Sequence, residues 1–286
     1  MKREYNRKIK KASVHQPRTL LIMSPPKTGK TVITANLTTE FAPGDSQVIS
    51  IGDEDNYNVV DANYEHFNTL TSFEKYLDDL IKDQPFTFIA YDNLSALDEW
   101  CEYYGTLAYM GSSMGKNFNL KARQVNERAV GPRFNTKTYA QYFLKGDPEF
   151  MSVYSLAKGS GYLWGRSVSD RIMRKMSQSA KHVIFLGHIK MNDDTKDDSG
   201  KVVRSEFLAY TGKAGTKIVQ EADVVSSMYR KKGEGYLSFK HGSTDMNAGC
   251  RFAYLEGQQV LISNKEEDGT ITVNWDLVYP NYKKKD

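Results

Sequence analysis

Cysteine is scarce in this sequence. Among its 286 residues only Cys101 and Cys250 occur, far apart along the chain. Two such thiols exclude the disulfide framework of small secreted domains and lack the paired spacing of a zinc site. We therefore expect both cysteines to be reduced, in a cytoplasmic protein.

Long apolar runs are also missing. No stretch approaches the roughly 18 unbroken apolar residues that a membrane helix needs, so no contact with a membrane is expected. The first 18 residues are basic and have no apolar segment, which is not typical of a secretory signal. Because 40% of the residues are hydrophobic, the chain can still form a substantial core.

The net charge of +4 is unevenly distributed. Basic residues gather in the N-terminal tail, in the last four residues and in residues 101–166, where nine Lys or Arg stand against four Asp or Glu. Such clustering suits contact with a phosphate backbone better than an evenly basic surface does. For the tails alone, a simple effect on solubility is an equally open interpretation.

One segment has the pattern of a phosphate-binding loop. Residues 24–31, SPPKTGKT, match G-x-x-x-x-G-K-[ST] at every fixed position except the first. An apolar strand at 19–23 is predicted before it and an amphipathic helix at 32–41 after it. Backbone N–H groups at such a helix start face phosphates, the glycine permits close approach, the lysine neutralises phosphate oxygens and the threonine ligates Mg²⁺. The first glycine of the pattern normally permits a tight bend. Here Ser24, followed by Pro25 and Pro26, is expected to make that bend. The predicted nucleotide-binding residues are Ser24, Pro25, Pro26, Lys27, Thr28, Gly29, Lys30, Thr31 and Val32.

Three further apolar strands, predicted at 47–51, 86–92 and 181–188, end in polar side chains. Because the carboxyl ends of parallel strands share one edge of a sheet, these side chains can meet the loop. Asp92 is expected to hold Mg²⁺ together with Thr31. One acidic residue of 53–55 can deprotonate the attacking water, or the three can form an ordinary solvated turn. His188 can donate a hydrogen bond to a γ-phosphate, or be a histidine with a purely structural role.

Helices are predicted at 72–83 and at about 162–179. The second of them carries four apolar residues as its expected core face: Leu163, Ile172, Met173 and Met176.

The stretches SPPKTGKT, VISIGDED, FIAYDNLSAL and VIFLGHIKM, in this order, resemble the core of RecA-type P-loop ATPases. The resemblance implies that Glu54 is the general base and that His188 senses the γ-phosphate in place of the usual glutamine. The catalytic set it implies is Glu54, Lys30, Asp92 and His188. A cation near the closing hairpin would reach a neighbouring subunit's nucleotide. Lys240 is the first candidate and Arg251 the second. The equally open alternative is that such a residue is an ordinary exposed cation on a strand.

The resemblance is nearest to small phage-encoded RecA-like ATPases of the single-strand annealing or recombination type. It is carried by YDNLSALDEW, by the helix start at Trp164-Gly165-Arg166 and by a histidine as sensor. It implies a location in the host-cell cytoplasm. Because Asp92 and His188 are 96 positions apart, it also implies an insertion at about 101–160. The expected organisation is a basic tail at 1–17, an ATPase domain at 18–280 and a basic tail at 281–286.

The predicted insertion interleaves cations with aromatic rings. Cations can neutralise phosphates while rings stack on unpaired bases, which is a sequence-tolerant mode of binding single strands. Packing of the rings on the core or on another subunit is the alternative. Glycines at 105, 111, 115 and 131 are expected to keep parts of the insertion mobile. The candidate DNA-binding residues are Lys116, Lys121, Arg123, Arg128, Arg133 and Lys137.

A second loop is predicted at 191–206 because this stretch is polar and contains glycine. Its four aspartates argue against direct contact of residues 193–198 with DNA, since carboxylates repel phosphates. The possible contacts in and after this loop are Lys201, Arg204, Lys213 and Lys217.

Together these features predict an α/β protein with a RecA-like P-loop core, a mainly parallel sheet flanked by helices, and antiparallel strands near the C-terminus. The expected reaction is hydrolysis of ATP to ADP and phosphate, with Mg²⁺ and stimulated by DNA. The expected partners are single-stranded DNA, further copies of the chain in a ring or filament, and a single-stranded-DNA-binding protein. A nucleotide-gated assembly protein and a helicase-type motor are the alternatives.

Overall fold

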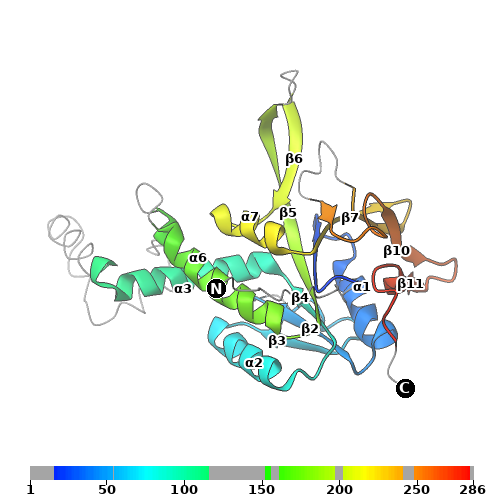
Figure 1. Cartoon of the computed structure of the whole chain (residues 1–286), viewed down its shortest axis with the longest axis horizontal. Helices are drawn as coiled ribbons and strands as arrows, with labels where there is room; N and C mark the ends of the chain where they lie inside the picture. Colours follow the sequence, from blue (N-terminus) through cyan, green and yellow to red (C-terminus); the bar gives the residue numbers. More distant parts are fainter. Residues whose placement is uncertain are drawn as a thin grey trace, which may run out of the picture.

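The computed structural model describes residues 16–53, 55–115, 152–155, 161–196, 202–240 and 248–283. A mixed sheet runs through the centre of the molecule (Figure 1). Its strands are β1 Thr19–Ser24, β2 Ser46–Ile51, β3 Tyr64–Phe67, β4 Phe88–Asp92, β5 His182–Lys196, β6 Val202–Leu208, β7 Val224–Lys231, β8 Glu234–Ser238, β9 Gly249–Cys250, β10 Gln259–Lys265 and β11 Ile271–Val273. The strand order is β11-β10-β8-β7-β1-β5-β4-β2-β3, with β6 paired to β5 and β9 to β7.

The six strands β3, β2, β4, β5, β1 and β7 are parallel to one another. The pairs β7–β8, β8–β10 and β10–β11 are antiparallel. This arrangement confirms the predicted fold class in its general form, a mainly parallel sheet with helices and antiparallel strands toward the C-terminus. Within the described residues, no helix combines the length and the apolarity needed to cross a bilayer.

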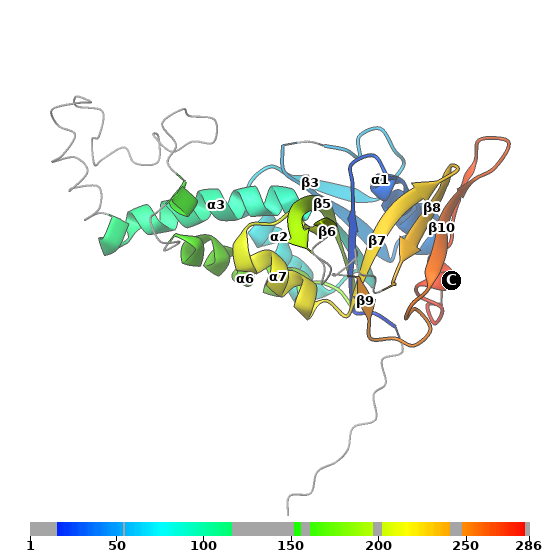
Figure 2. The same cartoon turned by 90° about the horizontal axis from the view of Figure 1, so that it is seen from above.

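The helices lie on both faces of the sheet (Figures 1 and 2). They are α1 Lys30–Asn36 with its π-helical continuation Leu37–Phe41, α2 Leu70–Asp83, α3 Leu94–Gly111, α6 Tyr162–Gln178 and α7 Gly212–Glu221, with 3-10 turns at Val153–Ser155 and Trp275–Leu277. Side-chain caps fix two of the starts: Thr69 accepts a hydrogen bond from the Ser72 N–H at α2, and Asn93 accepts one from the Ala96 N–H at α3.

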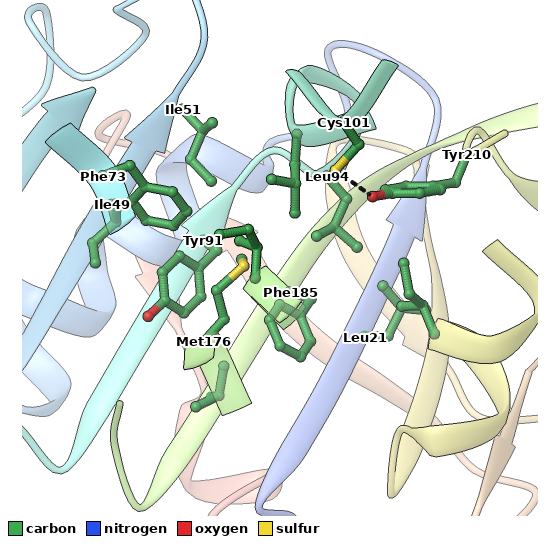
Figure 3. Packing of buried hydrophobic residues seen from close by; sticks show 14 of the residues in the cluster. Leu21, Ile49, Ile51, Phe73, Tyr91, Leu94, Cys101, Met176, Phe185 and Tyr210 are labelled. Atoms are coloured by element: carbon green, nitrogen blue, oxygen red, sulfur yellow. Dashed lines mark hydrogen bonds between the residues drawn. The ribbon is translucent and has the colours of Figure 1, made fainter. Parts of the chain in front are cut away.

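Successive side chains of the parallel strands point to opposite faces of the sheet, so the hydrophobic core consists of two clusters, one on each face. In β1, Leu21 and Met23 face the helices α2, α3, α6 and α7, whereas Leu20 and Ile22 face α1 and the C-terminal turn. This period of two is what a strand buried on both faces requires. Figure 3 shows the first of these clusters, where Tyr91 and Phe185 of adjacent strands lie against side chains of the covering helices. Cys101 belongs to this cluster, and both it and the half-buried Cys250 are free.

The helix α3 was not predicted, because its residues fall partly in the stretch assigned to the insertion. Its buried residues lie on more than one side of the helix and therefore show no simple period: Leu94, Leu97, Trp100, Cys101, Gly105, Thr106, Tyr109 and Met110. A helix placed between a sheet and a second helix buries more than one face.

The expectation that Gly105 keeps the chain mobile is wrong. Gly105 lies within α3, where a Cβ would come within 2.7 Å of the Gly165 backbone nitrogen in α6. Two glycines therefore let α3 and α6 approach closely, and Figures 1 and 2 both show these helices side by side. The predicted core face of α6 is also partly wrong: Ile172 and Met176 are buried, but Leu163 is 59% exposed.

The stretch predicted as a loop at 191–206 is instead largely β-structure. The strand β5 continues eight residues beyond His188 and pairs antiparallel with β6, from Ile189 opposite Leu208 to Lys196 opposite Val202. This hairpin projects from the body of the molecule in Figure 1. The β-branched residues Val202 and Val203 favour a strand, and the polar composition that suggested a loop did not outweigh the ladder of backbone hydrogen bonds.

The N-terminal segment is fixed to the sheet by a buried histidine. The His182 side chain, 1% exposed, bonds through Nδ1 to the Pro17 carbonyl at 2.6 Å, and its Nε2 lies 3.2 Å from Gln16 Nε2. Burial lowers the pKa of His182; the Pro17 bond opposes that shift, and the charges of Lys181 and Arg18 add to it. The folded protein thus holds the ring neutral.

The lowered pKa of His182 predicts that the free energy of unfolding depends on pH. Since the folded-state pKa of His182 lies below 6.5, the unfolded chain takes up a proton first as the pH falls, and stability is lost below about pH 6.5. Thermal unfolding between pH 7.5 and 5.5 should show a falling midpoint. The His182→Gln variant should show a smaller decline over this interval. Equal declines in the two proteins would contradict this role.

Candidate nucleotide site

The loop between β1 and α1 has the geometry of a tight turn into a helix. The backbone of Lys27 and that of Gly29 have φ angles of 63° and 101°, both in the left-handed region. The Gly29 carbonyl accepts the Ile33 N–H at 3.1 Å, which begins the helical hydrogen bonding. N–H groups in the first turn of a helix have no partner within it and can therefore bind an anion.

Ser24 ties this loop together, at the position where the loop pattern has glycine. Its Oγ accepts hydrogen bonds from Lys30 Nζ and from Thr28 Oγ1, each at 2.7 Å, and it donates to the Pro25 carbonyl at 3.0 Å. The serine is the last residue of β1 and is 1% exposed. Its hydroxyl therefore positions the lysine amine over the loop, a role that glycine cannot fill.

Three side chains from different elements meet at the carboxyl edge of the parallel strands. Ser24 of β1 lies opposite His188 of β5 in register, and Asp92 ends β4, the strand on the other side of β5. Lys30 Nζ lies 3.5 Å from His188 Nδ1. The structure thus brings Lys30, His188 and Asp92, which are far apart in the sequence, to one edge of the sheet.

Asp92 is held by a buried tyrosine. The Tyr57 hydroxyl donates to Asp92 Oδ2 at 2.9 Å and lies 2.7 Å from Thr34 Oγ1. The Thr31 side chain lies near enough to this phenol to act on its pKa. Tyr57 is 0% exposed and packs beside Tyr64. It thus fixes Asp92 close to Thr31, the other residue that the sequence assigns to the metal ion.

Burial governs the charges at this site. It lowers the pKa of Lys30, and the nearby Asp92 carboxylate opposes that shift. It also raises the pKa of Asp92, against the hydrogen bond from Tyr57 and the charge of Lys30. Burial and the Asp92 charge together raise the pKa of Tyr57 well above its usual value, so this phenol keeps its proton and acts as a donor. Burial disfavours the charged forms of both Lys30 and Asp92, and each charge partly offsets this cost for the other.

The acidic turn after β2 is only partly described. Glu54, the expected general base, lies outside the described residues. Asp55 accepts hydrogen bonds from the Tyr57 N–H and the Tyr64 hydroxyl, each at 3.2 Å, and so holds the turn that carries Tyr57. Gly52 has a φ of 111°, and a Cβ there would lie 2.8 Å from Ala96 Cβ, so the turn is packed against the start of α3.

The structure adds one cation that the sequence analysis did not select. Arg230, in β7 next to β1, lies beside the loop: a Cβ placed on Gly29 would be 3.6 Å from Arg230 Nη2. In the sequence this residue is one of three consecutive cations, RKK, and resembles any exposed strand end. Only the pairing of β7 with β1 reveals its position.

The two cations expected to act on a neighbouring subunit lie elsewhere. Arg251 Nη1 lies 3.3 Å from Asp223 Oδ1, and the other oxygen of Asp223 accepts the N–H groups that begin β1, so Arg251 is at the amino edge of the sheet. Lys240 follows β8 by two residues and is exposed. Neither lies at the loop of its own chain. The DNA-binding candidates Lys116, Lys121, Arg123, Arg128, Arg133 and Lys137 all lie outside the described residues.

Removal of the Tyr57 hydroxyl should impair turnover more than folding. We expect Tyr57→Phe to lose the hydrogen bond that orients Asp92, so that the ATP turnover predicted from the sequence falls about tenfold. Magnesium titration of that turnover should show a higher metal requirement. Tyr64→Phe, which removes a neighbouring hydroxyl that bonds only to Asp55 among the described residues, is the matched control. An unchanged magnesium requirement in Tyr57→Phe would remove this role.

Comparisons with known proteins give a limited result. No family model matches the sequence, and no curated protein matches it either. Among solved structures the chain is similar to one described as the crystal structure of the RadB recombinase, with 11% sequence identity over 90% of this chain and 91% of that chain and a TM-score of 0.42. The function proposed next therefore rests on the geometry of the site itself.

Proposed function

We propose that this protein is a RecA-like P-loop ATPase that acts on single-stranded DNA. One observation carries the proposal: Lys30, Asp92 and His188, from three separate elements, meet beside a glycine-containing loop at the carboxyl edge of a parallel sheet. The order of strands supports it, because the loop strand β1 and the Asp92 strand β4 are separated by one strand, which carries His188.

The residues fit magnesium and a triphosphate. The Thr31 hydroxyl and the Asp92 carboxylate are hard oxygen ligands of the kind that Mg²⁺ prefers, and Tyr57 fixes the carboxylate. When bound, the ion would neutralise charge on the phosphate oxygens. The buried amine of Lys30 and the N–H groups of the loop bind and orient the phosphates. Thr31 and Asp92 would hold the ion.

Two further roles complete the proposed reaction, ATP and water giving ADP and phosphate. Glu54 accepts the proton of the attacking water, and His188 donates a hydrogen bond to the γ-phosphate. The contact of His188 with Lys30 Nζ supports the second role. Such catalysis depends mainly on position and charge, since phosphoryl transfer needs an in-line water and stabilised oxygens. Lys240 and Arg251 are proposed to act on the nucleotide of an adjacent subunit.

The DNA step is proposed as annealing or strand exchange in recombination, by a ring or filament of this chain, with a single-stranded-DNA-binding protein as a further partner. The clustered cations and rings of residues 116–143 support contact with single strands. The competing function is a nucleotide-gated assembly protein, or a helicase-type motor, with the same ATP site.

Salt titration of oligonucleotide binding tests the proposal. Anisotropy of a labelled oligo(dT) should show binding that ATP strengthens and that weakens steeply with salt, because each phosphate contact releases counterions. Absence of binding at about 50 mM salt, with ATP bound, would favour the assembly protein.

A further inference from the structure

A groove lies at the ends of three helices, away from the phosphate edge. It is lined by the start of α6, by the start of α7 and by Met114 just beyond α3, and it encloses about 840 Å³. Among the described residues six large hydrophobic side chains are markedly exposed, and three of them line this groove: Met114 at 63%, Tyr162 at 43% and Leu163 at 59%. Such a concentration of exposed apolar surface is typical of a binding site.

The rings in the groove are arranged for stacking. Tyr154 and Tyr162 are parallel, with centroids 5.0 Å apart and an interplanar angle of 14°. The half-buried Trp164 lies edge-on to Tyr109, at 5.7 Å and 70°. Tyr162 also rests on Gly212, where a Cβ would meet its Cδ1 at 3.2 Å. The Tyr162 ring is thus supported by Tyr154 and Gly212, and Tyr162 is 43% exposed to solvent.

The described lining of the groove carries two cations. Among the described residues, Arg166 and Lys213 line it and no carboxylate does. Asp98 and Glu102 lie close by, since their charges add to burial in raising the pKa of the lining Tyr154. Within the described residues neither cation forms an ion pair. The cavity between α6 and α7 at the other edge of the sheet is different: its cations Arg18, Arg174 and Lys217 face the carboxylates of Asp170, Glu221 and Asp223. The described lining of the groove thus carries cations alone, whereas that of the second cavity carries both signs of charge.

We propose that this groove binds single-stranded nucleic acid, with one base stacked on Tyr162 and backbone phosphates on Arg166 and Lys213. An exposed ring gives a base a sequence-tolerant surface, and two cations that form no ion pair among the described residues give the phosphates their counter-charge. The inference rests on the proposed function for its substrate class, but it joins Lys213, a possible contact from the sequence, to Arg166 and Tyr162, which the sequence did not select for DNA contact.

Short connections join the groove to the phosphate edge. The His188 carbonyl accepts the Ala209 N–H at 2.7 Å, and two residues later Thr211 begins α7. Thr211 bonds to Asp98 Oδ2 of α3 through its N–H at 2.9 Å and its hydroxyl at 2.6 Å. Because α3 starts two residues after Asp92, the helices that line the groove are joined to both Asp92 and His188 by short segments.

Charge removal in the groove provides the test. The binding of fluorescein-labelled oligo(dT) is measured for the full chain and for the double variant Arg166→Gln/Lys213→Gln. Binding should weaken about tenfold or more, and the slope of log affinity against log salt should become shallower by about 1.4, since each single-strand phosphate contact contributes about 0.7. Arg174→Gln, on the same helix but lining the other cavity, should bind as the unaltered protein does.

Ring removal provides the second arm. Tyr162→Ala should weaken oligo(dT) binding about fivefold to a hundredfold and leave the slope of log affinity against log salt unchanged. Tyr162→Phe should bind as the unaltered protein does, because the ring is kept. Quenching of Trp164 fluorescence by the oligonucleotide should be lost in Tyr162→Ala. Circular dichroism and ATP binding, measured on each variant, establish that the fold and the nucleotide site are intact.

The outcomes separate this inference from the proposed function. If the chain hydrolyses ATP but the double variant binds oligo(dT) as before, the groove is not the contact and the inference fails. If binding depends on Arg166, Lys213 and Tyr162 but ATP is not bound, the inference stands and the proposed function fails. If Leu163→Ser alters the sedimentation of the protein while the double variant leaves DNA affinity unchanged, the groove is a subunit interface, which also overturns the inference.

Discussion

Replacement of Lys30 with alanine is expected to abolish ATP binding, with a loss of affinity of at least about 100-fold. Lys30 is 7% exposed, and its amine is held by Ser24 Oγ and the Pro25 carbonyl at the helix start. A charge in such a position interacts strongly with phosphate, because at an effective dielectric constant of 20 two unit charges 4 Å apart interact by about 4 kcal/mol. Isothermal titration with ATP, or displacement of a fluorescent nucleotide, measures the loss.

A loss of binding could also arise from unfolding, which a stability measurement distinguishes. Burial lowers the pKa of Lys30, so its charged form costs free energy in the folded state. Its removal should therefore leave a folded protein, as seen by circular dichroism. Lys82→Ala, which removes an exposed cation near the end of α2, should bind ATP normally. Normal ATP affinity in Lys30→Ala would refute the site as a phosphate loop.

Asp92→Asn is expected to retain ATP binding but to lose turnover by about 100-fold or more. The amide has the shape of the carboxyl group and can still accept the hydrogen bond from Tyr57, but it has no charge with which to hold the metal shell. Phosphate release should therefore fall, and added Mg²⁺ should not restore it. Turnover close to that of the unaltered protein would remove Asp92 from the metal site.

The stability of the same variant should not fall at neutral pH. Because burial raises the pKa of Asp92, the folded state binds protons more readily than the unfolded state above pH 3.8. The carboxyl group therefore lowers stability as the pH rises through its folded-state pKa, and the neutral amide lacks this cost. Thermal unfolding at pH 7.5 should give a midpoint at or above that of the unaltered protein. A stable protein with lost turnover identifies a functional carboxylate, since a structural one would change both in the same direction.

Several elements could be predicted from the sequence because local patterns determine them. An apolar run from Thr19 to Met23 before SPPKTGKT can hardly be anything but a strand that enters a turn and a helix. The helix at 72–83 was predicted from its periodic apolar face, and the structure places it at Leu70–Asp83. Helix α3 could not be predicted in this way, since a helix buried on more than one side has no amphipathic period.

The sequence by itself determined the strands β1, β2 and β4, the first part of β5, the loop, and the residue types that can bind phosphate and magnesium. These depend on hydrophobic period and on the chemistry of short motifs. The tertiary structure decided which of them meet. Tyr57 reaches Asp92 because β2 and β4 are adjacent, Arg230 reaches Gly29 because β7 pairs with β1, and the groove forms where α6 and α7 begin beside the end of α3. Contacts between distant segments depend on strand order and helix packing, which no local pattern in one sequence encodes.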